Sequence, residues 1–473
     1  MSSVIWAIFA AVLIGAVLWL IHCVTISKYA LARHRAWAMR HRISARLRPG
    51  PGFATVAELW IRWSKLAALS HGHRARPGLR LWDRLTSPAT GYAVRFGRAQ
   101  YGHRAYGRMQ DQVLMLAPPQ SGKSGMLADR IIDHPGPVVC TSTRADLFTN
   151  TAGLRSRRGP VATFNPLGIG GIPSTFGWNI IDGCAEPDTA IRRAQDLTGD
   201  YPAGDMKWWQ YKASAALAAL LHAAGLLPGA TILDVHAWVH RHGDKMAEDI
   251  LDTNPAASRA LRSILAEIRQ LGKTADSVRA TISESLTWVA VDELAAAVTP
   301  PPGTGFDVGD FVRRNGTLYL IAPGTETAPI APLFQSFVQH VHYEAGLIGS
   351  MSPAGKLDPP LWLALDELTQ VCPLPLPAIL ADSAGKGILV AAVVHSLGQL
   401  ESRWGRPGAE TVWAPAAPRS CCPASPTRPP WRTSPACAAR SAFPLTVADW
   451  SGLRRCRRSC CGCSRAGGRW CSL

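Results

Sequence analysis

The sequence APPQSGKS occupies residues 117–124, between a short, mostly apolar run at 112–116 and a stretch at 125–132 that is compatible with a helix. A strand, a loop ending in Gly-Lys-Ser and a helix form the context of a phosphate-binding loop. The backbone N–H groups of such a loop and the dipole of the following helix both favour a bound phosphate. The residues expected to surround the nucleotide are Ala117, Pro118, Pro119, Gln120, Ser121, Gly122, Lys123, Ser124 and Gly125.

Two side chains of this loop have expected roles in catalysis and metal binding. The Lys123 ammonium would neutralise the β- and γ-phosphates, and the Ser124 hydroxyl would bind Mg²⁺. Ala117 stands at the position of the usual first glycine, which is acceptable only where the backbone keeps a negative φ. The loop therefore predicts a nucleotide site that works with Mg²⁺.

A second motif supplies the acids that such a site needs. The apolar run Leu361–Leu365 is followed by Asp366 and Glu367. Asp366 would hold the magnesium shell, and Glu367 would orient or deprotonate the attacking water. The alternative to a functional role is that the two acids simply lie at a solvated strand end. The all-apolar run before them favours the functional role, because such a run is typical of a strand buried on both faces of a parallel sheet. Lys123 and Glu367 are thus the predicted catalytic residues, and Ser124 and Asp366 the predicted metal ligands.

A third buried strand is expected at 387–394, and it ends at His395 with Gln399 close behind. Polar side chains at such a strand end can contact the γ-phosphate of the bound nucleotide. His395 and Gln399 are therefore candidate nucleotide-binding residues. Each could equally be a helix-cap or surface residue, and the sequence leaves the two readings open.

The long separation of Lys123 and Asp366 indicates an inserted domain. Helical spacing of Ala and Leu over 207–224, 256–271 and 274–294 predicts an all-α domain at about 175–300. The proline-rich turn at 299–303 closes it, and a strand at 317–322 returns to the sheet. The expected fold is α/β, with a nucleotide-binding domain formed by 109–174 and 301–413.

The amino terminus carries a candidate membrane anchor. The eighteen residues Val4–Ile21 are apolar and uncharged, and at about 1.5 Å per residue they can cross a hydrocarbon core of roughly 30 Å. Basic residues follow this run and none precedes it, which argues against a cleaved signal peptide and places the later chain in the cytoplasm. We expect residues 1–27 to be a single-pass anchor in the bacterial inner membrane.

Residues 28–108 form a basic juxtamembrane region, and its tryptophans Trp60, Trp63 and Trp82 have two possible roles. They could lie against anionic headgroups or belong to a linker with a short helix. The formal charge of +17 lies in the two ends of the chain, whereas residues 109–410 are acidic, so the charge is weak support for DNA binding. Only four of the twelve cysteines precede residue 411, which indicates a reduced, intracellular body.

Several motifs together resemble the type IV secretion coupling proteins, the TraG/TraD-like ATPases of conjugative DNA transfer. They are the loop 117–124, Trp208-Trp209 before an Ala/Leu helix, the acid-ended strand 361–368 with its Pro-Leu-Pro continuation, and the segment from Gly385 to Gly405. The resemblance implies a RecA-like P-loop domain with an all-α insert, ATP and Mg²⁺ as cofactors, and a membrane-anchored homo-hexamer. It also implies delivery of a relaxase-bound DNA strand, or of secreted proteins, to the secretion channel.

The sequence departs from this family in four places. One membrane span is found where two are usual, Ala117 replaces a glycine, Arg144 stands where lysine is common, and His395 where glutamine is frequent. Two other functions stay open. The chain could be a catalytically impaired adaptor that docks secreted proteins through its α domain, or a double-stranded DNA pump, which the long insert disfavours.

The tail 414–473 does not share the composition of the body. Lysine is absent, Arg, Pro, Cys and Ser dominate, and neither helical nor strand periodicity remains. Cys460 and Cys463 form a single C-x₂-C unit without a histidine or a second unit, which is insufficient for a zinc site. A shifted reading frame and a lack of ordered structure are the preferred interpretation. Loss of the final strands would leave nucleotide binding intact and ATPase activity weak or absent.

Overall fold

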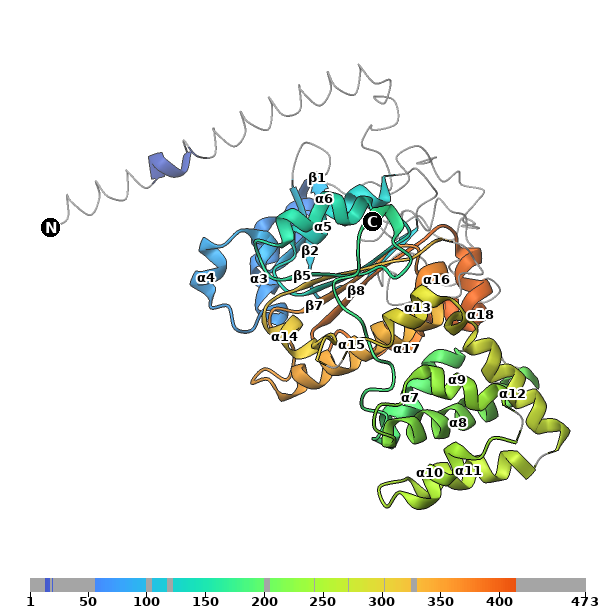
Figure 1. Ribbon diagram of the computed structural model, residues 1–473. Helices are drawn as coiled ribbons and strands as arrows, with labels where there is room; N and C mark the ends of the chain where they lie inside the picture. Colours follow the sequence, from blue (N-terminus) through green and yellow to red (C-terminus); the bar gives the residue numbers. More distant parts are fainter. Residues whose placement is uncertain are drawn as a thin grey trace, which may run out of the picture.

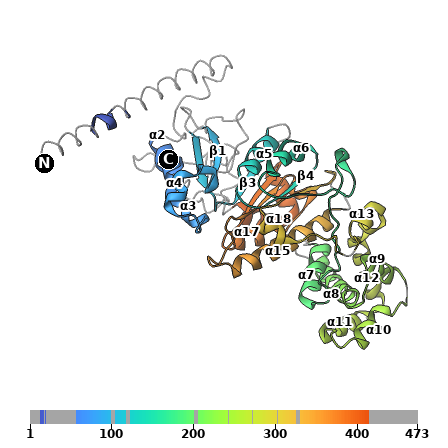
Figure 2. The same ribbon diagram turned by 60° about the vertical axis from the view of Figure 1, so that its left-hand side comes forward.

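The computed structural model describes residues 13–17, 19, 56–98, 104–116, 122–199, 205–241, 243–270, 272–301, 303–324 and 330–413. Three parts are visible along the chain in Figure 1: an amino-terminal module, a sheet domain and a domain of helices. The sheet domain lies between the other two (Figure 2). The predicted anchor is almost entirely, and the tail 414–473 entirely, outside the described residues. Within those residues, none of the helices has both the length and the hydropathy needed to span a bilayer.

The sheet has six parallel strands in the order β3-β8-β7-β4-β6-β5. The bounds are β3 (Val113–Leu116), β4 (Val138–Ser142), β5 (Val161–Phe164), β6 (Thr317–Ile321), β7 (Leu361–Leu365) and β8 (Ile388–Val394). Every residue of β4, β6, β7 and β8 is buried, as expected of central strands in a sheet covered on both faces. The predicted α/β fold with a parallel sheet is confirmed. Among the described strands, β3 lies at one edge.

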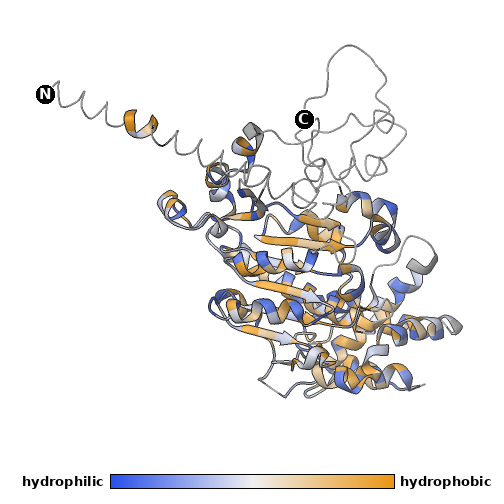
Figure 3. Cartoon of the chain, turned by 90° about the horizontal axis from the view of Figure 1, so that it is seen from above, coloured by the Kyte–Doolittle hydropathy of each residue, from blue (hydrophilic) through white to orange (hydrophobic). Residues whose placement is uncertain are grey.

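Helices cover both faces of this sheet. In Figure 1, α5 (Lys123–Asp133) and α6 (Asp146–Arg155) lie on one face, and α15 (Ala331–Met351) and α17 (Leu376–Asp382) on the other. The strands are hydrophobic along their length, whereas the covering helices alternate between hydrophobic and hydrophilic residues (Figure 3). The remaining helices of the domain are α14 (Val308–Arg313), α16 (Leu368–Val371) and α18 (Leu397–Trp413).

The helical domain is built around α8 (Asp205–Leu226), which contacts α7, α9, α10, α11 and α12. Its alanines and leucines from Ala213 to Ala224 are mostly buried, and small side chains on a central helix allow its neighbours to approach closely. The other helices are α7 (Pro187–Thr198), α9 (Ile232–His240), α10 (Met246–Thr253), α11 (Arg259–Gln270), α12 (Lys273–Ser285) and α13 (Asp292–Ala297).

The helix expected over 274–294 is interrupted. α12 ends at Ser285, and a 3-10 turn, η4 (Thr287–Ala290), precedes α13. Leu286, just before the turn, and Trp288 within it are buried, at 0% and 1% exposed. Burial of these two large side chains outweighs the continuous helical periodicity of the sequence.

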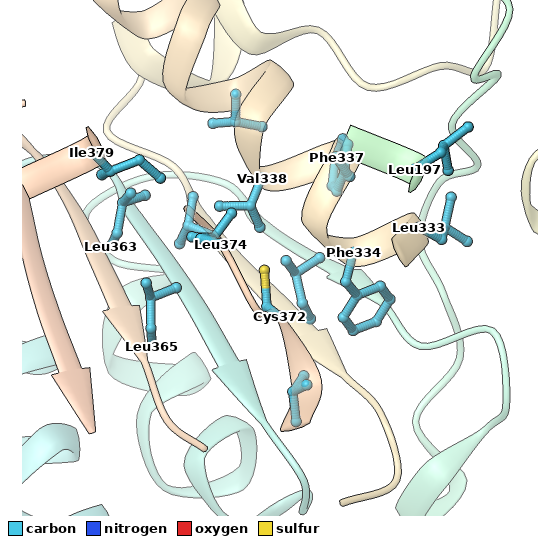
Figure 4. Close-up of a cluster of buried hydrophobic side chains, with 14 of the residues drawn as sticks. Leu197, Leu333, Phe334, Phe337, Val338, Leu363, Leu365, Cys372, Leu374 and Ile379 are labelled. Carbon is cyan, nitrogen blue, oxygen red and sulfur yellow. The ribbon is translucent and has the colours of Figure 1, made fainter. Parts of the chain in front are cut away.

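Apolar side chains join the helical domain to the sheet. Figure 4 shows Leu197 of α7 beside Leu333 and Phe337 of α15, with Leu363 and Leu365 of β7 further into the cluster. Phe337 also contacts the ring of Trp178, whose centroid is 4.9 Å away. The helical domain is therefore packed directly against the sheet domain.

Residues 56–108 contain a small folded module. It comprises α2 (Val56–Trp63), α3 (Lys65–Ala75), α4 (Leu81–Thr86), a 3-10 turn η1 (Ala89–Gly91) and an antiparallel hairpin of β1 (Ala93–Arg98) and β2 (Arg104–Arg108). Its own small core includes Ala68, Tyr92 and Tyr106. A Cβ on Gly72 would lie 2.8 Å from Cδ2 of Tyr92, so glycine is required where α3 meets the hairpin.

Candidate functional site

The functional side chains follow the ends of neighbouring parallel strands. β7 continues directly into Asp366 and Glu367, and β8 into His395. α5 begins at Lys123, and its N-cap Gly122 adopts the left-handed conformation with φ 86°. Because parallel strands present their carboxyl ends at one edge of the sheet, the lysine and the acids meet there.

The Lys123 ammonium lies among these groups. Its Nζ is 3.3 Å from Oε1 of Glu367 and 3.9 Å from Oδ1 of Asp366. The side chains of Lys123, Asp366 and Glu367 are 10%, 6% and 19% exposed, so the ion pairs are largely shielded from water. The structure thus brings the predicted catalytic pair, Lys123 and Glu367, into direct contact.

Ser124 and Asp366, the two predicted metal ligands, also converge. The Ser124 hydroxyl donates to Oδ2 of Asp366 across 3.5 Å. The Thr141 hydroxyl of β4 donates to the backbone carbonyl of Asp366 at 2.9 Å. The backbone N–H of Glu367 donates to Oδ1 of Asp366 at 3.1 Å. A hydroxyl and a carboxylate at this separation are hard oxygen ligands of the kind Mg²⁺ prefers, so the residues fit that ion.

Burial raises the pKa of Asp366 above its ordinary value, and the nearby Lys123 ammonium opposes part of this rise. The second carboxylate, Glu367, adds to the increase. Two acids beside a single lysine leave excess negative charge in a buried place. A divalent cation at Ser124 and Asp366 would compensate that charge.

Glu367 has a strained backbone. Its φ is 50°, one of two positive values among the described non-glycine residues. The left-handed conformation costs a residue with a Cβ about 1–2 kcal/mol. Strain of this kind persists where the surroundings impose it, which is common at functional sites. Here it turns the carboxylate from the end of β7 toward Lys123.

Gly324 lies close to the side chains of both Thr143 and Glu367, and no sequence pattern singles out Gly324. A Cβ on Gly324 would lie 2.7 Å from Cγ2 of Thr143 and 3.1 Å from Oε2 of Glu367. Gly324 follows β6, and Thr143 follows β4, so both come from strand ends at the same edge. The absence of a side chain at 324 leaves room for the strained glutamate.

His395 and Gln399 are placed differently. The two ring nitrogens of His395 are 3.3 and 3.4 Å from Nζ of Lys123, and its Nε2 is 3.7 Å from Oε1 of Glu367. The Gln399 carbonyl oxygen instead accepts a hydrogen bond of 2.8 Å from the backbone N–H of His395. His395 therefore belongs to the cluster, whereas Gln399 caps the strand end and holds the histidine in place.

The first turn of α5 contains Gly125, which has no side chain. The preceding loop residues Ala117, Pro118, Pro119, Gln120 and Ser121 lie outside the described residues. Gly125 is in the first turn of α5, and a Cβ added to it would have no described neighbour within 4 Å. The N–H groups and the positive dipole end of α5 lie next to Lys123, an arrangement that favours an anion there.

Comparison with known proteins supports one family. Residues 360–421 match a family model described as the TraM recognition site of TraD and TraG. The fold is similar to the bacterial conjugative coupling protein TrwBΔN70, with a TM-score of 0.52 and 17% identity over 66% of this chain and 68% of that chain. It is also similar to TrwB solved with ADP and Mg²⁺, with a TM-score of 0.50 and 16% identity over 66% and 71% of the two chains.

A search of curated proteins finds no match. The family-model match covers the acid-ended strand β7 and the segment from 366 to 405 that carries the sequence resemblance. The shared fold extends over 66% of this chain. The resemblance of this chain to the TraG/TraD-like type IV secretion coupling proteins is therefore confirmed.

Proposed function

We propose that the chain is an ATP-binding coupling protein that delivers DNA to a type IV secretion channel. The observation that carries this proposal is the convergence of Lys123, Ser124, Asp366 and Glu367 at the carboxyl edge of a parallel sheet. A TrwB structure of the same fold holds ADP and Mg²⁺, which supports ATP and Mg²⁺ as the cofactors.

Each residue has a role that follows from its position. Lys123 would bind the β- and γ-phosphates, and Ser124 and Asp366 would hold Mg²⁺. Mg²⁺ when bound supplies positive charge to the phosphates. Glu367 would orient the attacking water and accept its proton at Oε1, the atom that now faces Lys123. His395 would contact the γ-phosphate from the end of β8.

Nucleotide binding exchanges the partners of Lys123. In the structure its ammonium is shared between Glu367 and His395, at 3.3 Å from each. A phosphate that takes over the ammonium would release Glu367 from the ion pair. The glutamate would then be free to act as a base only when the lysine is engaged by nucleotide.

We further propose that the predicted anchor Val4–Ile21 places this protein in the inner membrane, with the sheet and helical domains in the cytoplasm and six copies assembled around the transported strand. Hydrolysis is expected to be weak in this chain. In support, β3, which leads into the phosphate loop, has no neighbour on its outer side among the described strands.

The experiment is a DNA-binding titration of the full chain in lipid nanodiscs. Labelled single-stranded and duplex oligonucleotides are titrated with and without ATP and Mg²⁺, using wild type and Lys123→Ala. We expect preferential binding of the single strand, with an affinity that changes on addition of nucleotide in the wild type but not in Lys123→Ala. Lys212→Ala is the matched control, because Lys212 pairs with Glu267 on the helical domain at 2.7 Å.

Two outcomes contradict the proposal. A chain that binds no DNA but retains secreted proteins of the same system would be an adaptor. A chain that binds duplex more tightly than single strand would be a duplex pump. Either result would leave the nucleotide site in place and reject the assigned substrate.

A further inference from the structure

Exposed hydrophobic side chains are concentrated in the amino-terminal module. Residues 60–85 carry six large ones with exposed fractions of 45% to 74%, whereas the described residues from 87 to 413 carry nine. A concentration of exposed apolar side chains of this kind is typical of an interaction site. The six residues, here called the apolar face, are Trp60, Ile61, Leu66, Leu81, Trp82 and Leu85.

The module does not need these side chains for its own core. α2 buries Leu59, and its Trp63 contacts the Phe96 ring of β1 edge-on at 6.0 Å, so Ile61 lies on the opposite side of the helix and Trp60 at the boundary between the two sides. α4 turns Arg84 inward, where its Nη1 donates to the Leu69 carbonyl at 3.2 Å. Both α2 and α4 therefore direct large apolar side chains outward.

Positive charge is interleaved with the apolar face. Arg62, Lys65 and Arg80 are exposed beside it. In sequence, residues 56–92 hold six Lys and Arg against two acids, Glu58 and Asp83. Such a surface repels a second copy of itself and attracts an anionic partner. The aliphatic side chains favour lipid over nucleic acid, because single strands are bound by stacking on aromatic rings.

The module is firmly attached to the nucleotide-binding domain. Arg76 forms an ion pair with Asp358 in which both side chains are at most 15% exposed, and the Gly78 N–H donates to the same carboxylate at 2.6 Å. Arg95 of β1 pairs with Asp129 and Asp133 of α5, at 2.6 and 2.9 Å. α5 begins at Lys123, so the apolar face is linked to the nucleotide site through one helix.

We propose that α2, α3 and α4 lie on the surface of an anionic bilayer, with the apolar face among the lipid headgroups. The helices occupy the end of the molecule opposite α10 and α11 (Figure 2), which leaves the helical domain directed away from the membrane. Interfacial segments of this kind combine apolar side chains with Lys and Arg. The inference rests on the proposed function, because the bilayer is the one into which Val4–Ile21 would insert, 34 residues before α2.

The test uses the full chain in vesicles of phosphatidylcholine with or without 30% phosphatidylglycerol. A fluorescent amino acid replaces Trp82, and lipids with a nitroxide near the headgroup act as quencher. The matched control carries the same fluorophore at Met246, which is 52% exposed on α10. We expect quenching at 82 to exceed that at 246 severalfold with phosphatidylglycerol, and to weaken in 0.5 M salt. ATP-analogue binding verifies that both labelled proteins are folded.

A charge variant provides a second, independent readout. Arg62→Glu with Lys65→Glu changes two exposed positions and should lower quenching at 82 at least twofold without affecting nucleotide binding. Equal quenching at 82 and 246 overturns the inference, as does a fluorescence change at 82 that is caused by DNA or by a second copy in detergent. Flotation separates the two hypotheses: chains that do not float with the vesicles reject the anchor, and chains that float without quenching reject the apolar face as a membrane contact.

Discussion

Lys123 and Glu367 form an ion pair of 3.3 Å although 244 positions separate them in the sequence. The contact arises because α5 starts beside the carboxyl end of β7, with β8 between β3 and β7 in the sheet. We propose that this pair represents one of two states of the site, and that in the other a bound phosphate holds the lysine. Both states depend on the residues that hold this pair in place.

The strain at Glu367 predicts an unusual order of stability. Glu367→Gly and Glu367→Ala both remove the carboxylate, but only glycine adopts a φ of 50° without a steric penalty. We expect the glycine variant to be more stable than the alanine variant by about 1 kcal/mol. Chemical denaturation of the two proteins measures the difference. Equal stability, or a more stable alanine variant, would show that the backbone at 367 is not strained.

Asp366 predicts a stability difference that depends on pH. Burial raises its pKa in the folded state, so the folded protein binds this proton more tightly than the unfolded chain, and stability is lost as the pH rises above the ordinary carboxyl range. Asp366→Asn keeps the neutral form at every pH. Without nucleotide and Mg²⁺, we expect Asp366→Asn to be more stable than wild type at pH 7, and the advantage to disappear below about pH 4. A pH-independent difference would contradict the assigned cause.

The close packing at Gly324 predicts that a second substitution restores the stability lost in Gly324→Ala. In Gly324→Ala the new methyl would lie 2.7 Å from Cγ2 of Thr143, so we expect a loss of about 1–3 kcal/mol in stability and weaker nucleotide binding. Thr143→Ser removes Cγ2. The double variant should recover most of the lost stability, as measured by thermal unfolding. If Gly324→Ala leaves the stability unchanged, or if Thr143→Ser fails to restore it, the close approach of position 324 to Cγ2 of Thr143 is wrong.

The buried hydrogen bonds of Arg155 predict a large loss of stability when this residue, which lies away from the nucleotide site, is substituted. Its buried guanidinium donates to the Thr317 hydroxyl at 2.7 Å and to the carbonyls of His134 and Gly136 at 2.6 and 2.7 Å, which ties α6 to the starts of β4 and β6. Arg155→Met should cost about 3 kcal/mol, because several buried acceptors lose their donor. Arg158→Met is the matched control. Arg158 shares only the His134 carbonyl, at 3.1 Å, and should change stability by less than about 1 kcal/mol.

Much of the sheet is predictable because several of its strands are continuous apolar runs in the sequence. The runs 361–365 and 388–394 are apolar on both faces, so the continuous apolar pattern alone identifies them. β5 escapes prediction, since its first two residues are only half-buried and the strand is four residues long. The module at 56–108 escapes prediction too, because its hairpin is stabilised by contacts of Tyr92 and Tyr106 with α3 that leave no periodic signal.

The site is predictable by residue type but not by geometry. Gly-Lys-Ser and the acid-ended strand identify Lys123, Ser124, Asp366 and Glu367 from local sequence. The hydrogen bond that Gln399 accepts from the backbone N–H of His395 could not be predicted from residue type alone. Gly324 has no local signal, because its importance lies in a contact with side chains from two other strand ends.

The nucleotide site is tested most directly by equilibrium binding of a fluorescent ATP analogue to the full chain in nanodiscs, with and without Mg²⁺. We predict one magnesium-dependent site per chain. Lys123→Ala should weaken binding about a hundredfold, which corresponds to about 2.7 kcal/mol, whereas Lys212→Ala should bind like wild type. Wild-type affinity in Lys123→Ala, or binding that does not depend on Mg²⁺, would contradict the claim that Lys123, Ser124 and Asp366 form one nucleotide site.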